Sequence, residues 1–374
     1  MKNKSLLSIL AAALILTGCS SNKIVESKMS RTELQNFPSH ISEELDKNLT
    51  IDAETLVFNA ENYNVLNVKY KQYDETEVSN IFLKDEIIDT RTENGKDNDK
   101  NVWIKTKSNK DLIISKHYLR FDVDNKDYTH LMFESNRHLF NEMKLKFPKD
   151  TLESLNKKDS IDKVKQVAKD LDLSLYDEPI VYSLDVNSLR DAENNFMTDE
   201  QYADSEATKP GTGKVNWTEE DEAYLIIFKS TLNNIPIYSR GFRPSSDNSF
   251  LSPNHLKAVV NKNGIALFDV SSIYDSPSLS TENLSCIQYT EALKTIKDKY
   301  KNIIITDPIK ISNINLEYIP RLKDKELGEF KLTPAWVFLT EYEYIIDDVI
   351  SNSKIVIKDT DAILIDAITG KEIK

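Results

Sequence analysis

The feature that most constrains the fold is an amphipathic helix followed by apolar strands, a pattern that the chain carries twice after residue 150. Apolar residues return every three to four positions in both helices, which is the spacing of one helix face. The matching positions, at a constant shift of 129 residues, are Val164, Val167 and Leu171 in the first copy and Leu293, Ile296 and Tyr300 in the second. Ser160 and Thr290 stand where an N-cap is expected. The pattern predicts two diverged copies of one module, and hence an α+β fold with antiparallel sheets, each packed by a helix.

The strands that follow each helix also match in order. Near the end of the second copy, Ile363 and Ile365 alternate with their neighbours and are followed by Thr369 and Gly370. This predicts a closing hairpin, in which the glycine supplies a positive φ. Three pairs of segments correspond between the copies: AYLIIFKS with INLEYIP, IPIYSRGF with TPAWVFLTEYEYII, and LKAVVNKNGIALF with AILIDAITGKEI.

Residues 158–374 resemble the PepSY-type module and are similar to YycI-like regulatory proteins and uncharacterised Gram-positive lipoproteins. Three segments carry the resemblance: Pro334-Ala335-Trp336, Asn234-Ile235-Pro236-Ile237 and Asp366-Ala367-Ile368-Thr369-Gly370. The middle segment departs from the pattern, because Asn234 stands where the family has glycine. The resemblance implies an extracytoplasmic domain that binds or restrains another protein, such as a peptidase or a sensor kinase, without catalytic residues or a cofactor. We interpret Trp336 as a core residue and Asp366 as a turn residue.

The start of the chain is typical of an export signal. Lys2 and Lys4 precede an apolar run, Leu6 to Leu16, that is too short to span a bilayer. The run ends in Leu16-Thr17-Gly18-Cys19, which resembles the lipobox of bacterial lipoproteins. That resemblance implies that Cys19 receives a diacylglyceryl group and anchors the mature chain in the cell membrane, on its extracytoplasmic face.

These observations predict five parts. They are a signal peptide (1–18), a tether (19–30), an N-terminal α+β region (31–150) and two PepSY-like modules (151–280 and 281–374). Within the first module, a polar insertion over residues 190–221 is predicted to be a surface loop.

Cysteine content and charge limit the remaining possibilities. Cys286 is the second of two cysteines, so acylation of Cys19 leaves it without a partner for a disulfide. Its apolar surroundings, LSCIQY, favour a small buried side chain over a reactive thiol. The formal net charge of −13 disfavours nucleic acid as a partner.

Motifs for metal or catalytic chemistry are incomplete. His130 and His138, with Glu134 between them, share a helix face only loosely and predict no zinc site. The start of a calcium loop, Asp97-x-Asp99-x-Asn101, has Val102 and Ser108 in place of the glycine and the glutamate that such loops use.

An acidic run, Glu219 to Glu222 beside Trp217, is interpreted as a solvated loop, although it also suits a basic partner. No phosphate-binding glycine loop and no G-x-S-x-G nucleophile motif occurs in the sequence. The sequence therefore predicts no cofactor, no metal site and no enzyme.

The sequence favours a non-catalytic binding or regulatory lipoprotein that acts on another envelope protein. A strand at the edge of an antiparallel sheet can accept an extended segment of a partner, so this hypothesis expects an exposed, unpaired edge strand beside an apolar patch. Two alternatives remain open. A small-ligand-binding lipoprotein would need a concave pocket between the modules, and a surface hydrolase would need a nucleophile, a histidine and a carboxylate in one cleft.

Overall fold

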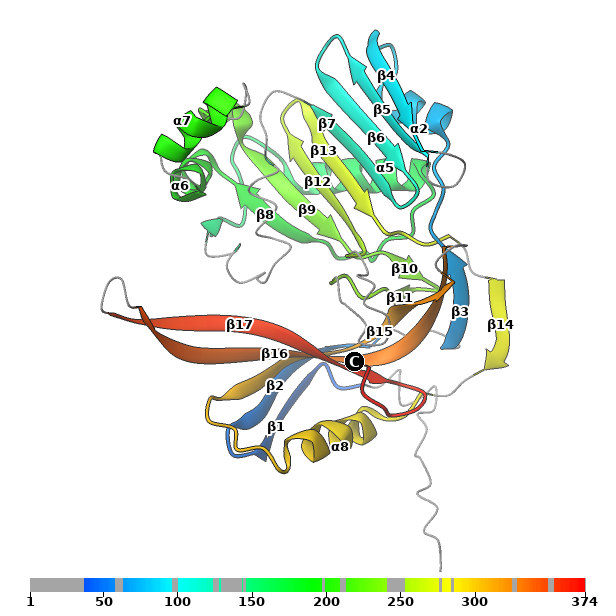
Figure 1. Cartoon of the computed structure of the whole chain (residues 1–374), viewed down its shortest axis with the longest axis vertical. Coiled ribbons are helices and arrows are strands. Elements are labelled where there is room, and N and C mark those ends of the chain that lie inside the picture. The colour runs from blue at the N-terminus through cyan, green and yellow to red at the C-terminus, as the bar shows by residue number, and fades with distance from the viewer. Residues whose placement is uncertain are drawn as a thin grey trace, which may run out of the picture.

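The computed structural model describes residues 37–57, 63–95, 100–123, 128, 143, 146–196, 199–208, 213–240, 253–275, 278–283, 286–324, 328–348 and 353–373. Two large, mainly antiparallel sheets dominate these residues, and helices pack on both (Figure 1). The predicted α+β class is confirmed. The signal peptide, Cys19, the tether, and the motifs around Asp97 and His130 lie outside the described residues.

The first sheet combines strands from both ends of the chain, in the order β1-β2-β15-β16-β3-β14, with β17 also paired to β16. Its strands are β1 (His40–Asp46), β2 (Leu49–Leu56), β3 (Asn64–Lys69), β14 (Ser278–Asn283), β15 (Ile309–Asp324), β16 (Glu329–Asp348) and β17 (Ser353–Asp366). The pairing of β2 with β15 is parallel, and the other pairings are antiparallel.

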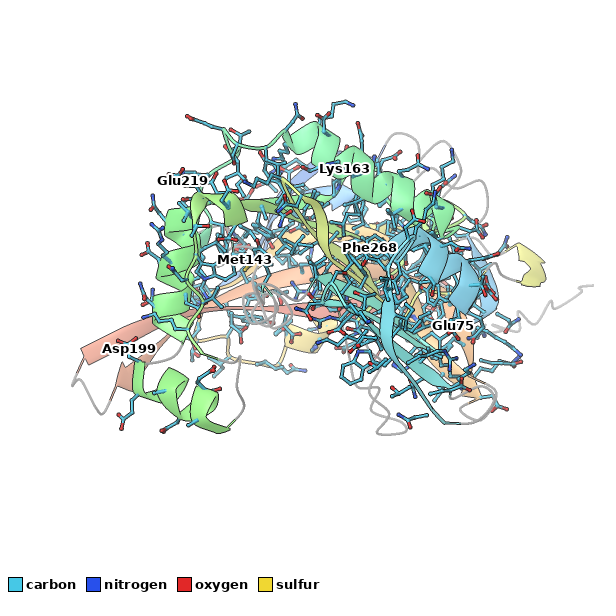
Figure 2. All side chains as sticks on the ribbon, turned by 90° about the horizontal axis from the view of Figure 1, so that it is seen from above. Glu75, Met143, Lys163, Asp199, Glu219 and Phe268 are labelled. Carbon is cyan, nitrogen blue, oxygen red and sulfur yellow. The ribbon has the colours of Figure 1, made fainter. Side chains whose placement is uncertain are left out.

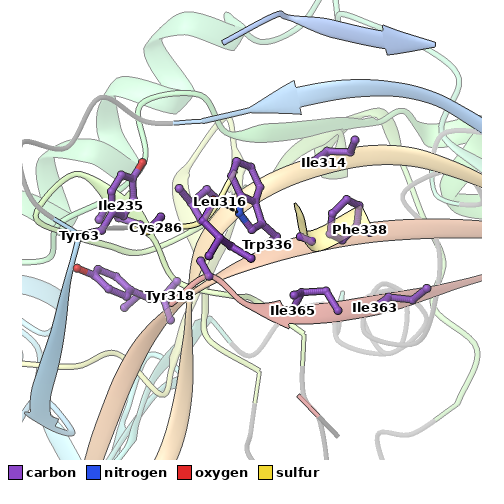
Figure 3. Close-up of a cluster of buried hydrophobic side chains, with 14 of the residues drawn as sticks. Tyr63, Ile235, Cys286, Ile314, Leu316, Tyr318, Trp336, Phe338, Ile363 and Ile365 are labelled. Atoms are coloured by element: carbon purple, nitrogen blue, oxygen red, sulfur yellow. Dashed lines mark hydrogen bonds between the residues drawn. The ribbon is translucent and has the colours of Figure 1, made fainter. Parts of the chain in front are cut away.

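Helix α8 (Tyr289–Tyr300) packs on the first sheet through Leu293 and Ile296. The core beneath it is built around Trp336 (Figure 3). The Trp336 ring stacks on Phe37 at a centroid distance of 5.6 Å. Trp336 Nε1 donates to the Ile287 carbonyl oxygen at 3.0 Å, so the polar atom of this buried ring is satisfied.

The second sheet has the order β4-β5-β6-β7-β13-β12-β9-β8. Its strands are β4 (Ile88–Asn94), β5 (Asn101–Thr106), β6 (Lys110–Ser115), β7 (Tyr118–Val123), β8 (Ile180–Leu184), β9 (Ala223–Phe228), β12 (His255–Asn261) and β13 (Gly264–Ser271). A small two-stranded sheet, β10 (Thr231–Leu232) with β11 (Ile235–Pro236), follows β9.

Helices cover the second sheet on both faces. Helix α5 (Lys157–Asp170) and helix α2 (Glu75–Phe82) pack on one face, where Phe82 stacks on Phe121 at 4.8 Å. Leu189, in helix α6 (Val186–Phe196), belongs to the core on the opposite face. Helix α7 (Asp199–Thr208) lies at the opposite end of the sheet from α2, as the positions of Asp199 and Glu75 in Figure 2 show.

Both predicted helices are present, but their caps differ from the prediction. Helix α5 begins earlier than Ser160 because Asn156 is its N-cap, with Asn156 Oδ1 accepting from the Asp159 N–H at 3.1 Å. Ser160 is buried inside the helix. Helix α8 begins at Tyr289 with Gln288 as N-cap, so Thr290 lies in its first turn.

The polar insertion at 190–221 was predicted to be a loop, and this prediction was wrong. Most of α6, all of α7 and a 3₁₀ turn (Glu219–Asp221) fall within it. The Glu193 carboxylate joins helix α6 to the far end of the insertion, because it accepts from Trp217 Nε1 and from the Val215 N–H, both at 3.0 Å. A local reading of polarity does not detect helices that are stabilised by such distant contacts.

The predicted division of the chain also differs from the pairing of its strands. Strands β1 to β3 belong to the first sheet and β4 to β7 to the second, so residues 31–150 contribute to both. The segment IPIYSRGF, expected to match PAWVF, forms only the short β11 and then leaves its sheet. Ile237 bridges Tyr318 of β15 in the first sheet instead.

The closing hairpin is confirmed. Asp366 Oδ1 accepts from the N–H groups of Ile368 and Thr369 at 2.9 and 3.0 Å, and Gly370 has a φ of 70°. Ile365 then forms a bridge with Glu372, which returns the chain onto β17.

Candidate functional site: an exposed sheet edge

Strand β4 is the outermost strand of the second sheet and pairs only with β5 among the described residues (Figure 1). Every residue of β4 is exposed. A shift in register between Ile88 and Thr90 marks a bulge, and the run from Thr90 to Asn94 pairs regularly. The free edge of this regular run offers backbone N–H and C=O groups to another strand.

Large apolar side chains gather at the same edge. Ile87 is 65% exposed, Ile88 is 45% exposed and Trp103 on β5 is 53% exposed. Two further exposed isoleucines, Ile303 and Ile304, follow α8 on the first sheet. An exposed tryptophan beside a strand with a free outer edge matches the feature that the binding hypothesis expects.

Charged side chains line the opposite face of β4. Arg91 donates through Nε and Nη2 to the two carboxylate oxygens of Glu75 at 2.7 and 2.9 Å, and through Nη2 to Glu93 at 2.8 Å. Lys100 Nζ lies 3.1 Å from Glu93. The hydrogen bond from Arg91 lowers the pKa of both Glu75 and Glu93, so these two carboxylates are charged at neutral pH.

A cross-strand row of residues connects the exposed edge to the buried centre of the second sheet. From the edge inward its members are Thr92, Trp103, Ile113, Arg120, Asp269 and Lys257. Residues directly opposite on neighbouring strands point to the same face, so these side chains share one face of the sheet. Exposure falls along the row, from 53% at Trp103 to 5% at Lys257.

Ionisable side chains meet at the buried end of the row. Asp269 accepts from the Tyr118 hydroxyl at 2.9 Å and lies 3.2 Å from His255 Nε2. Arg120 Nη2 donates to Asp122 Oδ2 at 2.5 Å. In β7, β12 and β13 these polar residues alternate with apolar ones, a period-two signal that the sequence analysis missed.

The surroundings of this cluster change its acid–base properties. Burial alone would raise the pKa of Asp269, but the hydrogen bonds from His255 and Tyr118 hold that pKa below its usual range. Burial lowers the pKa of His255 and lowers the pKa of the Lys257 ammonium to about 8. The cluster therefore keeps a carboxylate charged beside a destabilised ammonium.

The hydrolase alternative would require a nucleophile close to His255 and Asp269. Ser271 is the residue opposite His255 in the strand register, but Ser271 is 9% exposed and His255 is 8% exposed. Both residues are therefore largely shielded from solvent. Among the described residues, no group of histidine, cysteine, aspartate or glutamate side chains is suited to a metal ion.

A pocket of about 400 Å³ lies where α2 meets β5 and β6, rather than between the predicted modules. Charged and polar groups, including Glu75, Lys100 and Lys116, line much of it. Tyr73 is the one aromatic residue among those that line it, so this pocket is more polar than the aromatic pocket that the small-ligand alternative expects.

Residues singled out in the sequence take structural roles. Trp336 is fully buried and Asp366 holds the turn, as predicted. Cys286 is a buried free thiol, and burial raises its pKa to about 12, which makes it unreactive. In the acidic run, Glu222 Oε2 accepts from Ser154 Oγ at 2.6 Å, so this carboxylate fixes a loop.

Comparison with known proteins gives a fold and no function. No family model matches the chain, and no curated protein matches it. The structure is similar to the crystal structure of an uncharacterized protein from Eubacterium rectale, with a TM-score of 0.68 at 16% sequence identity. The match covers 92% of this chain and 97% of that chain. Among the described helices, none is long and apolar enough to cross a membrane.

Proposed function

We propose that the protein is an extracytoplasmic lipoprotein, anchored in the cell membrane through acylated Cys19, that binds and regulates another envelope protein without catalysing a reaction. The observation that carries the binding role is the exposed edge of β4 beside Ile88 and Trp103. An extended segment of the partner adds to β4 as a further strand, and its apolar side chains pack on Trp103. The lipobox at residues 16–19 supports the anchor.

The PepSY-like character of residues 151–280 and 281–374 belongs to the same proposal. Two parallels support it. Helices α5 and α8 each pack on a mainly antiparallel sheet. A glycine with positive φ stands in the last turn of each module, Gly264 in the first and Gly370 in the second. Such modules restrain other proteins, and the free edge of β4, which can accept a strand from a partner, is consistent with that role.

The test is crosslinking in membranes followed by purification of the anchored protein. Native protein and Ile304→Lys are expected to capture the same membrane protein, because Ile304 is exposed in the segment that connects α8 to β15 of the first sheet. Trp103→Lys places a charge on the apolar patch and is expected to abolish capture. Cys19→Ala is expected to abolish it because the unanchored chain loses its high local concentration at the membrane.

Two results would overturn the proposal in different ways. Capture that survives Trp103→Lys would show that the partner binds elsewhere. No enrichment by native protein, with all variants expressed and folded, would remove the support for a partner protein.

A further inference from the structure

The sequence of β4 is complementary to itself. Its regular run, Thr90 to Asn94, has Thr92 at its centre. Suppose that two copies of this run pair antiparallel about a twofold axis at Thr92. Thr92 then lies opposite Thr92 of the second copy, and Arg91 lies opposite Glu93 of the second copy in both halves of the interface. Opposite charges directly across two strands stabilise the pairing.

Other registers lack this match. A twofold axis at Arg91 would place Arg91 opposite itself and Asp89 opposite Glu93, so like charges would face each other. An axis at Thr90 would run through the bulge between Ile88 and Thr90, where the strand is irregular. The register centred on Thr92 is therefore the one that pairs the whole regular run with opposite charges across it.

The side chains needed for this interface are accessible. The side chains of Arg91 and Glu93 are each 41% exposed, although they also contact each other within one chain. On the other face, Trp103 is the neighbour of Thr92 in the register. Two copies therefore place Trp103, Thr92, Thr92 and Trp103 in one line across the joined sheets.

We propose that a second copy of this chain pairs with β4 in the register centred on Thr92, which joins two second sheets edge to edge. The inference rests on the proposed function in taking β4 as a binding edge. It adds that self-association occupies this edge until a partner segment displaces the second copy. The two occupants compete for the same backbone groups.

Register-specific disulfide formation tests the interface on the full anchored protein in its membrane. Thr92→Cys places two thiols directly opposite each other, about 4.5–5.5 Å apart at Cβ, so mild oxidation is expected to give a covalent dimer. Thr90→Cys is the matched control, with the same residue type on the same strand face. In this register the two thiols introduced at position 90 lie about 14 Å apart along the strand and cannot form a disulfide. The other described cysteine, Cys286, is buried.

Charge variants in the Thr92→Cys background test the pairing of Arg91 with Glu93. Either single substitution, Arg91→Glu or Glu93→Arg, places like charges opposite each other across the interface. Each is expected to lower the crosslinked fraction roughly tenfold. Co-expression of the two variants restores opposite charges in a mixed pair and is expected to restore crosslinking between them.

The outcomes separate this inference from the proposed function. If Thr92→Cys stays monomeric on oxidation, or if Thr90→Cys crosslinks as well as Thr92→Cys, the inferred interface is wrong, even if Trp103-dependent capture of another protein stands. If Thr92→Cys crosslinks with the expected charge dependence while native protein captures no other protein, the interface stands and the proposed partner fails.

Discussion

At the scale of single residues, the clearest departure from ordinary behaviour is the cationic side chain of Lys257. It is 5% exposed in the middle of a sheet, and burial lowers the pKa of its ammonium to about 8. Its partner across the strands, Asp269, remains charged because His255 and Tyr118 bind it. Keeping the Lys257 ammonium protonated in this buried position therefore lowers the free energy of unfolding, and the size of this loss depends on pH.

We expect the free energy of unfolding to rise between pH 8 and pH 10 on account of Lys257. Its pKa in the unfolded chain is about 10.4. The unfolded state therefore binds more protons in this window, and stability increases with pH. Lys257→Met is expected to remove about 1–3 kcal/mol of this rise. Urea unfolding at several pH values measures it.

The matched control for that measurement is Lys294→Met, which makes the same substitution at a side chain that is 64% exposed. If the profiles of native protein and Lys257→Met run parallel from pH 8 to pH 10, Lys257 does not lose its proton in the folded state in this range.

At the scale of elements, the sequence predicts well those helices and strands whose pattern depends on neighbouring residues alone. Helices α5 and α8 were predicted because their apolar periodicity needs no knowledge of the rest of the chain. The N-cap of α5 was not predicted correctly, because Ser160 and Asn156 are both good N-cap residues. The hydrogen bond to the Asp159 N–H identifies Asn156 as the cap. The exposure of Trp103 was also beyond local reasoning, because it depends on β4 being the last strand of its sheet.

The cap of α5 provides a prediction at this scale. Asn156→Ala removes the acceptor for the Asp159 N–H and is expected to lower the free energy of unfolding by about 1 kcal/mol. Asn156→Asp keeps an acceptor at the same position and should unfold close to the native protein. Chemical denaturation of the three proteins gives the comparison; equal losses for Ala and Asp would mean that the side-chain oxygen does not cap the helix.

At the scale of the whole molecule, the two sheets are joined by an ion pair whose carboxylate is buried and whose ammonium is partly exposed. Lys229 follows β9 of the second sheet, and its Nζ lies 2.6 Å from Glu317 Oε1 on β15 of the first sheet. The Glu317 side chain is 1% exposed and also accepts from Asn315 Nδ2 at 3.0 Å. The sequence held no signal for this contact, because it joins residues 88 positions apart across two sheets.

Breaking this pair from one side is expected to destabilise the junction. Lys229→Met leaves the Glu317 carboxylate buried without its counter-ion, at a cost of about 3 kcal/mol. Lys229→Met combined with Glu317→Leu removes both charges and should be more stable than Lys229→Met alone. Calorimetric unfolding of both variants and of Glu317→Leu completes the cycle, and additive effects would show that the two residues are not coupled.

The first sheet has a consequence for how the chain is made. Strand β2 is synthesised early, but the strand that pairs with it, β15, follows more than 250 residues later. The Asn48 carbonyl oxygen therefore has no Ile309 N–H to accept from until β15 has been made. When a polypeptide emerges from its N-terminus, all strands of the second sheet are therefore available while β2 and β3 still lack their partners β15 and β16. Premature termination anywhere before β15 leaves these early segments with open edges, which makes incomplete chains prone to aggregation and to quality-control proteases.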